Sequence, residues 1–129
     1  MGKDLHYLIL EFFKERMRGH GKVSTFGVLS LKEEIIYRIK RVGGLSEVIV
    51  HLSDDYAYTL HSYYSRPSQL NNGGFILVAK PEASFDPDII PLARNERIGI
   101  GKIGKLLGAL NHEKYWLYEE SGDDLRKRA

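Results

Sequence analysis

The sequence predicts a single α/β domain with a mostly parallel, four-stranded sheet and helices on both faces. Short runs rich in Val, Ile and Phe alternate along the chain with longer stretches whose apolar residues recur at helical spacing. Glycines, prolines and capping residues separate these stretches. The length of 129 residues suits one domain. We expect the domain to span residues 1–120, followed by a polar, flexible tail at 121–129.

The first third is expected to hold helix, strand and helix. Asp4 is a plausible N-cap for a first helix ending near Gly19, and Lys22–Leu29 is rich in strand-forming residues. Ser30 and Glu33 have capping-box spacing, which predicts a second helix up to Val42, stopped by two glycines. The apolar stripe of the first helix would contain Leu5, Leu8, Ile9, Phe12, Phe13 and Met17.

Three more strands are predicted, at residues 47–52, 74–79 and 97–103. The first two are short, mostly apolar runs, as in strands covered on both faces. Helices are expected from Ser53 to Ser65, after Asp86-Pro87, and over residues 104–110. Residues 112–120 fit either strand or helix. Strands that alternate with helices imply right-handed crossovers and parallel pairing.

Composition narrows the possible functions. The absence of cysteine excludes disulfides, thiolate metal sites and a cysteine nucleophile, and it suits a reducing cytoplasm. No apolar run is long enough to span a bilayer. Charged residues make up 28% of the chain, a proportion that would suit a thermophile. We expect no cofactor and no membrane partner.

Basic residues form two groups although the net charge is only +2. Such clusters can contact nucleic-acid phosphates, or they can simply solvate helix faces. Tyrosines at 56, 58, 63 and 64 could stack on bases or cover the sheet. The candidate nucleic-acid-binding residues are Arg16, Arg18, Lys22, Arg38, Lys40, Arg41, Lys102 and Lys105.

Four aspartates are the candidate catalytic residues. Asp54 and Asp55 follow a predicted strand, where open parallel sheets place ligands, and carboxylates there could bind a hard cation. Asp86 and Asp88 flank Pro87. Both pairs also fit ordinary helix starts. The five histidines have no ligand spacing, so no metal site is signalled, and no Ser or Thr lies in a nucleophile-elbow context.

The glycines at 99, 101 and 104, with Lys105, match two phosphate-loop patterns. A dinucleotide loop needs a full strand before its first glycine, and a triphosphate loop needs Ser or Thr where this chain has Leu106. The alternative is a glycine-containing strand that runs into a helix.

Two nuclease resemblances follow from these motifs. Asp86-Pro-Asp-Ile-Ile resembles the metal-binding segment of archaeal junction-cutting nucleases, whose next strand bears Glu-x-Lys; residues 97–102 lack that glutamate. The element order over residues 22–110 resembles restriction-endonuclease-like (PD-(D/E)XK-type) domains, in which a hairpin brings an Asp and the next strand carries Glu-x-Lys. Residues 22–30 have neither acid nor that pair, and no hairpin is predicted before them. The resemblance implies that the fold is kept without its chemistry.

These observations lead to three hypotheses. The first is a non-catalytic module that binds nucleic acid or a protein partner, and the nuclease resemblance would make it a domain that has lost its metal site. The second is a metal-dependent nuclease or other hydrolase that uses Asp54 and Asp55 or Asp86 and Asp88. The third is a homo-oligomeric subunit that pairs through an apolar strand edge or through its aromatic C-terminal segment.

Overall fold

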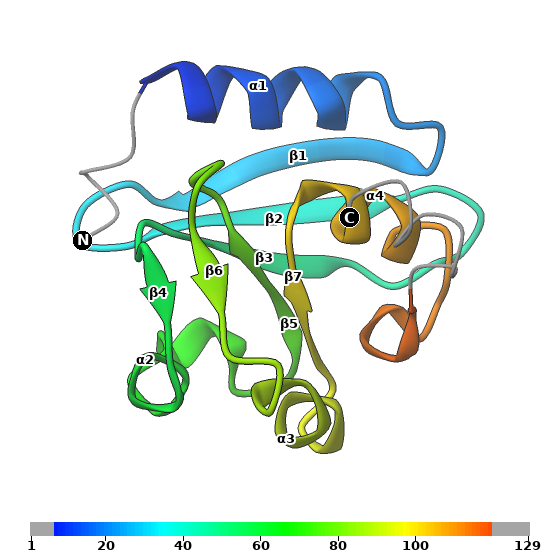
Figure 1. Cartoon of the computed structure of the whole chain (residues 1–129). Helices are drawn as coiled ribbons and strands as arrows, with labels where there is room; N and C mark the ends of the chain where they lie inside the picture. The colour runs from blue at the N-terminus through cyan, green and yellow to red at the C-terminus, as the bar shows by residue number, and fades with distance from the viewer. Residues whose placement is uncertain (1–6, 120–129) are drawn as a thin grey trace.

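The computed structural model describes residues 7–119 as one α/β domain with a mixed sheet. The five strands are β1 (Val23–Ser30), β2 (Ile35–Arg41), β3 (Val48–Ser53), β5 (Gly74–Val78) and β7 (Ile98–Gly101). They lie side by side in the order β1-β2-β3-β5-β7 (Figure 1). Strand β2 is antiparallel to both neighbours, whereas β3, β5 and β7 are parallel. The prediction of a four-stranded, mostly parallel sheet was therefore wrong in strand number and in the pairing of its first half.

The error comes from residues 30–42, which form a hairpin strand and not a helix. Ile35, Tyr37 and Ile39 are buried on one face of β2, while Arg38 and Lys40 are exposed on the other. This period of two, together with β-branched and aromatic residues, favours a strand. Two glycines at 43 and 44 adopt positive φ as predicted, but in the turn between β2 and β3.

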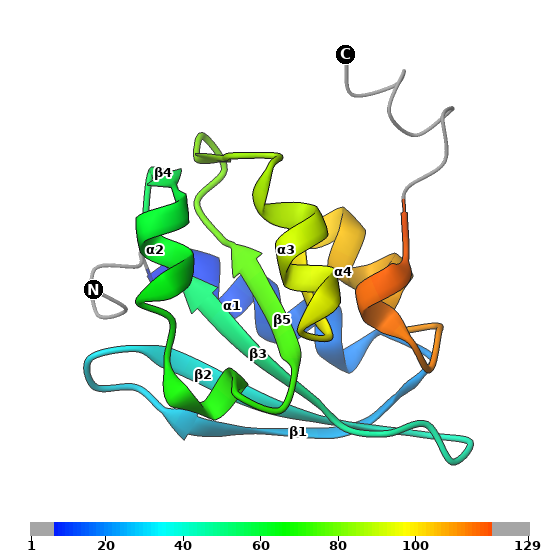
Figure 2. The same ribbon diagram turned by 90° about the horizontal axis from the view of Figure 1, so that it is seen from below.

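Helices pack on both faces of the sheet. Helices α1 (Tyr7–Arg18) and α4 (Ile103–Ala109) cover one face, burying Phe13, Met17 and Leu106 against it. Helices α2 (Leu60–Tyr64) and α3 (Ile89–Asn95) cover β3, β5 and β7 on the other face (Figure 2). The expectation of helices on both faces is confirmed.

The helices predicted to begin at Ser53 and at Asp86 both begin later in the structure. Ser53 ends β3, and the chain then forms β4 (Ala57–Tyr58) before Thr59 caps α2. Strand β4 pairs in parallel with β6 (Ser84–Phe85). The N-cap of α3 is Asp88, two residues later than predicted.

The last described residues contain a single 3-10 turn. Residues 112–119, which fitted either strand or helix, contain the 3-10 helix η3 (Tyr115–Leu117). A second 3-10 helix, η2 (Ser68–Leu70), precedes β5. The predicted cap Asp4 and the tail at 121–129 lie outside the described residues. No helix within residues 7–119 combines the length and apolarity that a membrane crossing requires.

Candidate functional site

Among residues 7–119, neither α2 nor α3 covers β1 or the part of β2 that carries Arg38 and Lys40. From the five-stranded sheet, the cluster beneath α2 and α3 includes residues of β3, β5 and β7 and none of β1 or β2. Figure 2 shows β1 and β2 extending past both helices. On this exposed area Thr25 lies opposite Lys40, and Gly27 lies opposite Arg38. We call these four residues the basic sheet face.

The basic sheet face is a shallow, positively charged surface. Arg38 and Lys40 are two residues apart on one strand, so their side chains project from the same face. A depression of about 240 Å³ is lined by both of them together with residues 25–29. The guanidinium of Arg38 forms an exposed ion pair with Glu47, at 3.1 Å between Nε and Oε2.

The other predicted basic residues lie elsewhere. Arg16 and Arg18 are on α1, across the sheet, where Arg18 pairs with Glu15 at 3.2 Å. Lys22 is exposed in the turn before β1. Lys102 follows the carboxyl end of β7, and Lys105 lies on α4. The structure therefore brings together only Arg38 and Lys40 on one exposed patch.

Arg41 is buried, and its side chain binds backbone oxygens. Its Nε donates to Ser46 O at 2.7 Å, and Nη1 donates to Leu110 O at 3.0 Å and His112 O at 2.7 Å. Desolvation lowers the pKa of Arg41, and the carboxylate of Glu113 acts in the opposite direction. These contacts give Arg41 a structural role in the fold.

The four candidate aspartates form two separate pairs. Asp54 and Asp55 precede β4, whereas Asp86 and Asp88 follow β6, which runs parallel to β4. The pairs therefore flank opposite ends of this small sheet. Asp86 Oδ1 accepts a hydrogen bond from Asp88 N at 2.9 Å, a contact typical of an Asx-turn. Within residues 7–119 no group of three His, Cys, Asp or Glu side chains could hold a metal ion.

A carboxylate–histidine pair joins Glu34, the residue before β2, to His51 of β3, and it was missed from the sequence. Glu34 Oε1 lies 2.7 Å from His51 Nε2, and the His51 side chain is only 6% exposed. Burial lowers the pKa of His51, while Glu34, Asp55 and Asp54 act to raise it. If residues 35–41 are recognised as a strand, its register with β3 places Glu34 close to His51.

Two polar atoms near this pair are buried without a hydrogen-bond partner among the described residues. They are His51 Nδ1 and the hydroxyl oxygen of Tyr58. Desolvation and the charge of Asp55 raise the pKa of Tyr58, so its hydroxyl stays protonated at neutral pH. The arrangement holds the imidazole in place and leaves one ring nitrogen able to accept or donate a proton.

The glycines of the phosphate-loop pattern have packing roles. A Cβ atom on Gly99 would lie 2.6 Å from the Phe75 ring, and one on Gly101 would lie 2.7 Å from the Lys105 side chain. Strand β7 and helix α4 match the predicted strand that runs into a helix. Close approach of side chains explains both glycines without a bound phosphate.

Comparisons with known proteins do not assign this chain to a family. No family model matches the chain, and no match was found among curated proteins or among solved structures.

Proposed function

We propose that this chain is a non-catalytic module that binds nucleic acid through the basic sheet face. The observation that carries the proposal is that Arg38 and Lys40 lie side by side on a part of the sheet that neither α2 nor α3 covers. Thr25 and Gly27 beside them leave the surface flat enough for a phosphate backbone to approach. Two cations at adjacent positions of one face can neutralise neighbouring phosphates. This electrostatic contribution supplies most of the affinity of non-specific nucleic-acid binding.

The topology also supports a nuclease-like ancestry for the module. A hairpin of β1 and β2 precedes β3, and a crossover through α2 leads from β3 to the parallel strand β5. The restriction-endonuclease-like pattern has a hairpin before the strand that bears Glu-x-Lys. In this chain the corresponding strand is β3, which carries His51 and no Glu-x-Lys.

A binding titration tests the contact surface. Fluorescence anisotropy with a labelled DNA duplex, at low and moderate salt, should show affinity that falls as salt rises. The double variant Arg38→Ala/Lys40→Ala should bind roughly tenfold or more weakly and should lower the salt slope by about two. Glu47→Gln should strengthen binding, because it removes a carboxylate that competes for Arg38.

The matched control removes two cations from the opposite side of the sheet. Lys14→Ala/Arg18→Ala changes net charge equally, and both residues lie on α1. Its salt slope should stay close to that of the unmodified chain. An equal loss of affinity in both double variants would contradict the assigned surface, and no binding at low salt would remove the proposal.

A metal-dependent hydrolase is the second candidate. Its candidate residues are Asp54 and Asp55, which follow β3, the strand that carries the buried His51, but no group of three His, Cys, Asp or Glu side chains within residues 7–119 could hold the ion. It predicts magnesium- or manganese-dependent cleavage that Asp54→Ala abolishes. Calorimetric titration with either ion tests it, since the absence of binding would leave the non-catalytic module.

A further inference from the structure

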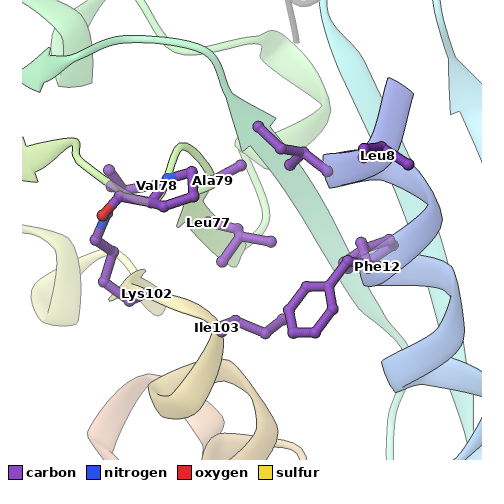
Figure 3. Close-up of a pocket in the computed structure, with 10 residues that line it drawn as sticks. Leu8, Phe12, Leu77, Val78, Ala79, Lys102 and Ile103 are labelled. Atoms are coloured by element: carbon purple, nitrogen blue, oxygen red, sulfur yellow. The ribbon is translucent and has the colours of Figure 1, made fainter. Parts of the chain in front are cut away.

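An apolar cavity of about 410 Å³ lies between α1 and the carboxyl ends of β5 and β7. Figure 3 shows Leu8 and Phe12 of α1 on one side of it, opposite Leu77 of β5 and Ile103 of α4. The volume falls within the range of small-molecule sites, roughly 300–1,000 Å³. Open α/β sheets bind ligands at the carboxyl ends of their parallel strands, which is where this cavity lies.

The side chains at the cavity mouth have more apolar surface than the fold covers. The apolar stripe predicted for α1 divides in two, because Phe13 and Met17 are buried whereas Leu8 and Phe12 are 63% and 52% exposed. Water in contact with these side chains would be released by an apolar group that enters the cavity. An apolar chain is therefore the part of a ligand that this cavity fits.

One cation lies in the wall. Lys102 Nζ donates to Lys80 O at 2.6 Å and to Pro81 O at 3.3 Å. An ammonium group has three donors, so one remains for a ligand. Burial lowers the pKa of Lys102, and the charge of Glu82 opposes this. A partly desolvated cation beside an apolar cavity favours an anionic group attached to an apolar chain.

We propose that this cavity binds an amphipathic carboxylate, a medium-chain fatty acid, with its acyl chain between α1 and β5 and its carboxylate at Lys102. The site is separate from the basic sheet face, because α1 and the basic sheet face lie on opposite sides of the sheet. The fatty-acid proposal can therefore be tested independently of the nucleic-acid proposal.

Calorimetric titration of the full chain with octanoate, below its micelle-forming concentration, tests the proposal. Octanol is the matched neutral ligand and should bind roughly tenfold more weakly, since it cannot pair with the ammonium group. Lys102→Met should reduce octanoate affinity roughly tenfold and leave octanol affinity unchanged. Retained octanol binding shows that the cavity of this variant is intact.

Two further variants locate the site. Ala79→Met should abolish binding of both ligands, because the half-buried Ala79 lines the cavity and a longer side chain would fill it. Lys105→Met, on the same helix as Ile103 but outside the cavity lining, should leave octanoate binding unchanged. The proposal is overturned by an absence of octanoate binding, by equal affinity for octanoate and octanol, or by octanoate binding that persists in Ala79→Met.

Discussion

Arg41 shows how a residue type typical of nucleic-acid contacts can serve the fold instead. Its side chain is fully buried, and its donors are shared between the β2–β3 turn and residues 110–113. The Tyr115 ring lies 5.6 Å from the guanidinium carbon. Removing the guanidinium would leave several buried carbonyl oxygens without a donor.

We expect Arg41→Met to lower the free energy of unfolding by about 2–4 kcal/mol, because methionine keeps the aliphatic stem and loses every donor. Urea unfolding followed by circular dichroism measures the change. Arg38→Met on the same strand is the matched control, and its exposed side chain should change stability by no more than about 0.5 kcal/mol. Equal effects of the two substitutions would show that Arg41 has no special structural role.

His51 gives the stability a defined dependence on pH. Burial holds the pKa of His51 in the folded chain below its ordinary value of about 6.5, so the unfolded chain takes up a proton first as the pH falls. The contribution of His51 to the free energy of unfolding is therefore constant at high pH. It is lost as the pH falls through about 6.5, and the loss stops below the folded pKa.

Urea midpoints at about pH 7.5 and about pH 5.5 test this expectation. The fall in stability between the two should be smaller in His51→Gln than in the unmodified chain. His61→Gln, which changes an exposed histidine, should keep the full fall. If His51→Gln and the unmodified chain lose the same stability, His51 is not the titrating group.

At the scale of elements, the sequence predicted the apolar strands well and β2 badly. Strands β3, β5 and β7 were predicted within three residues at every boundary, because continuous apolar runs between glycines leave few alternatives. In β2, Ile35, Ile36 and Ile39 also fit helical spacing, and Ser30 with Glu33 imitates a capping box. Pairing with β1 and β3 decided the conformation, and this tertiary contact leaves no local signal.

The same error determined how much of the site was predictable. Arg38 and Lys40 were named individually, but on a helix they would be two residues apart and would point in different directions. Only as strand residues do they share a face beside Thr25 and Gly27. The Glu34–His51 pair was missed for the same reason, since it depends on the register of β2 with β3.

Two strand glycines should respond oppositely to alanine. Gly99→Ala places a Cβ atom against the Phe75 ring and should destabilise the fold by about 1–3 kcal/mol. Gly27→Ala meets no atom within 4 Å and should be neutral or stabilising by up to about 1 kcal/mol. Thermal or urea unfolding compares them directly. A tolerated Gly99→Ala would mean that the Phe75 ring can move aside.

At the scale of the whole molecule, the two edges of the sheet differ. Strand β7 contacts α3, α4 and η3. Strand β1 is the other edge, and its pairing with β2 is irregular between Val23 and Thr25 and between Val28 and Ser30. Irregularities of this kind twist an edge and disfavour pairing with a second chain.

We therefore expect the chain to sediment as a monomer at concentrations on the order of tens of micromolar. Sedimentation velocity measures this directly. Val28→Lys, which adds a charge at an exposed edge position, should leave the sedimentation coefficient unchanged. A dimer that Val28→Lys dissociates would support the homo-oligomer hypothesis instead.

The contacts of Arg41 also have a consequence for synthesis of the chain. Arg41 donates hydrogen bonds to the carbonyl oxygens of Leu110 and His112, which follow it by 69 and 71 positions in the sequence. While these later residues are still inside the ribosome, the hairpin of β1 and β2 can form but the guanidinium must stay hydrated. We expect the nascent domain to close only after residues 110–113 emerge, so a ribosome-stalled chain that ends before them should remain protease-sensitive.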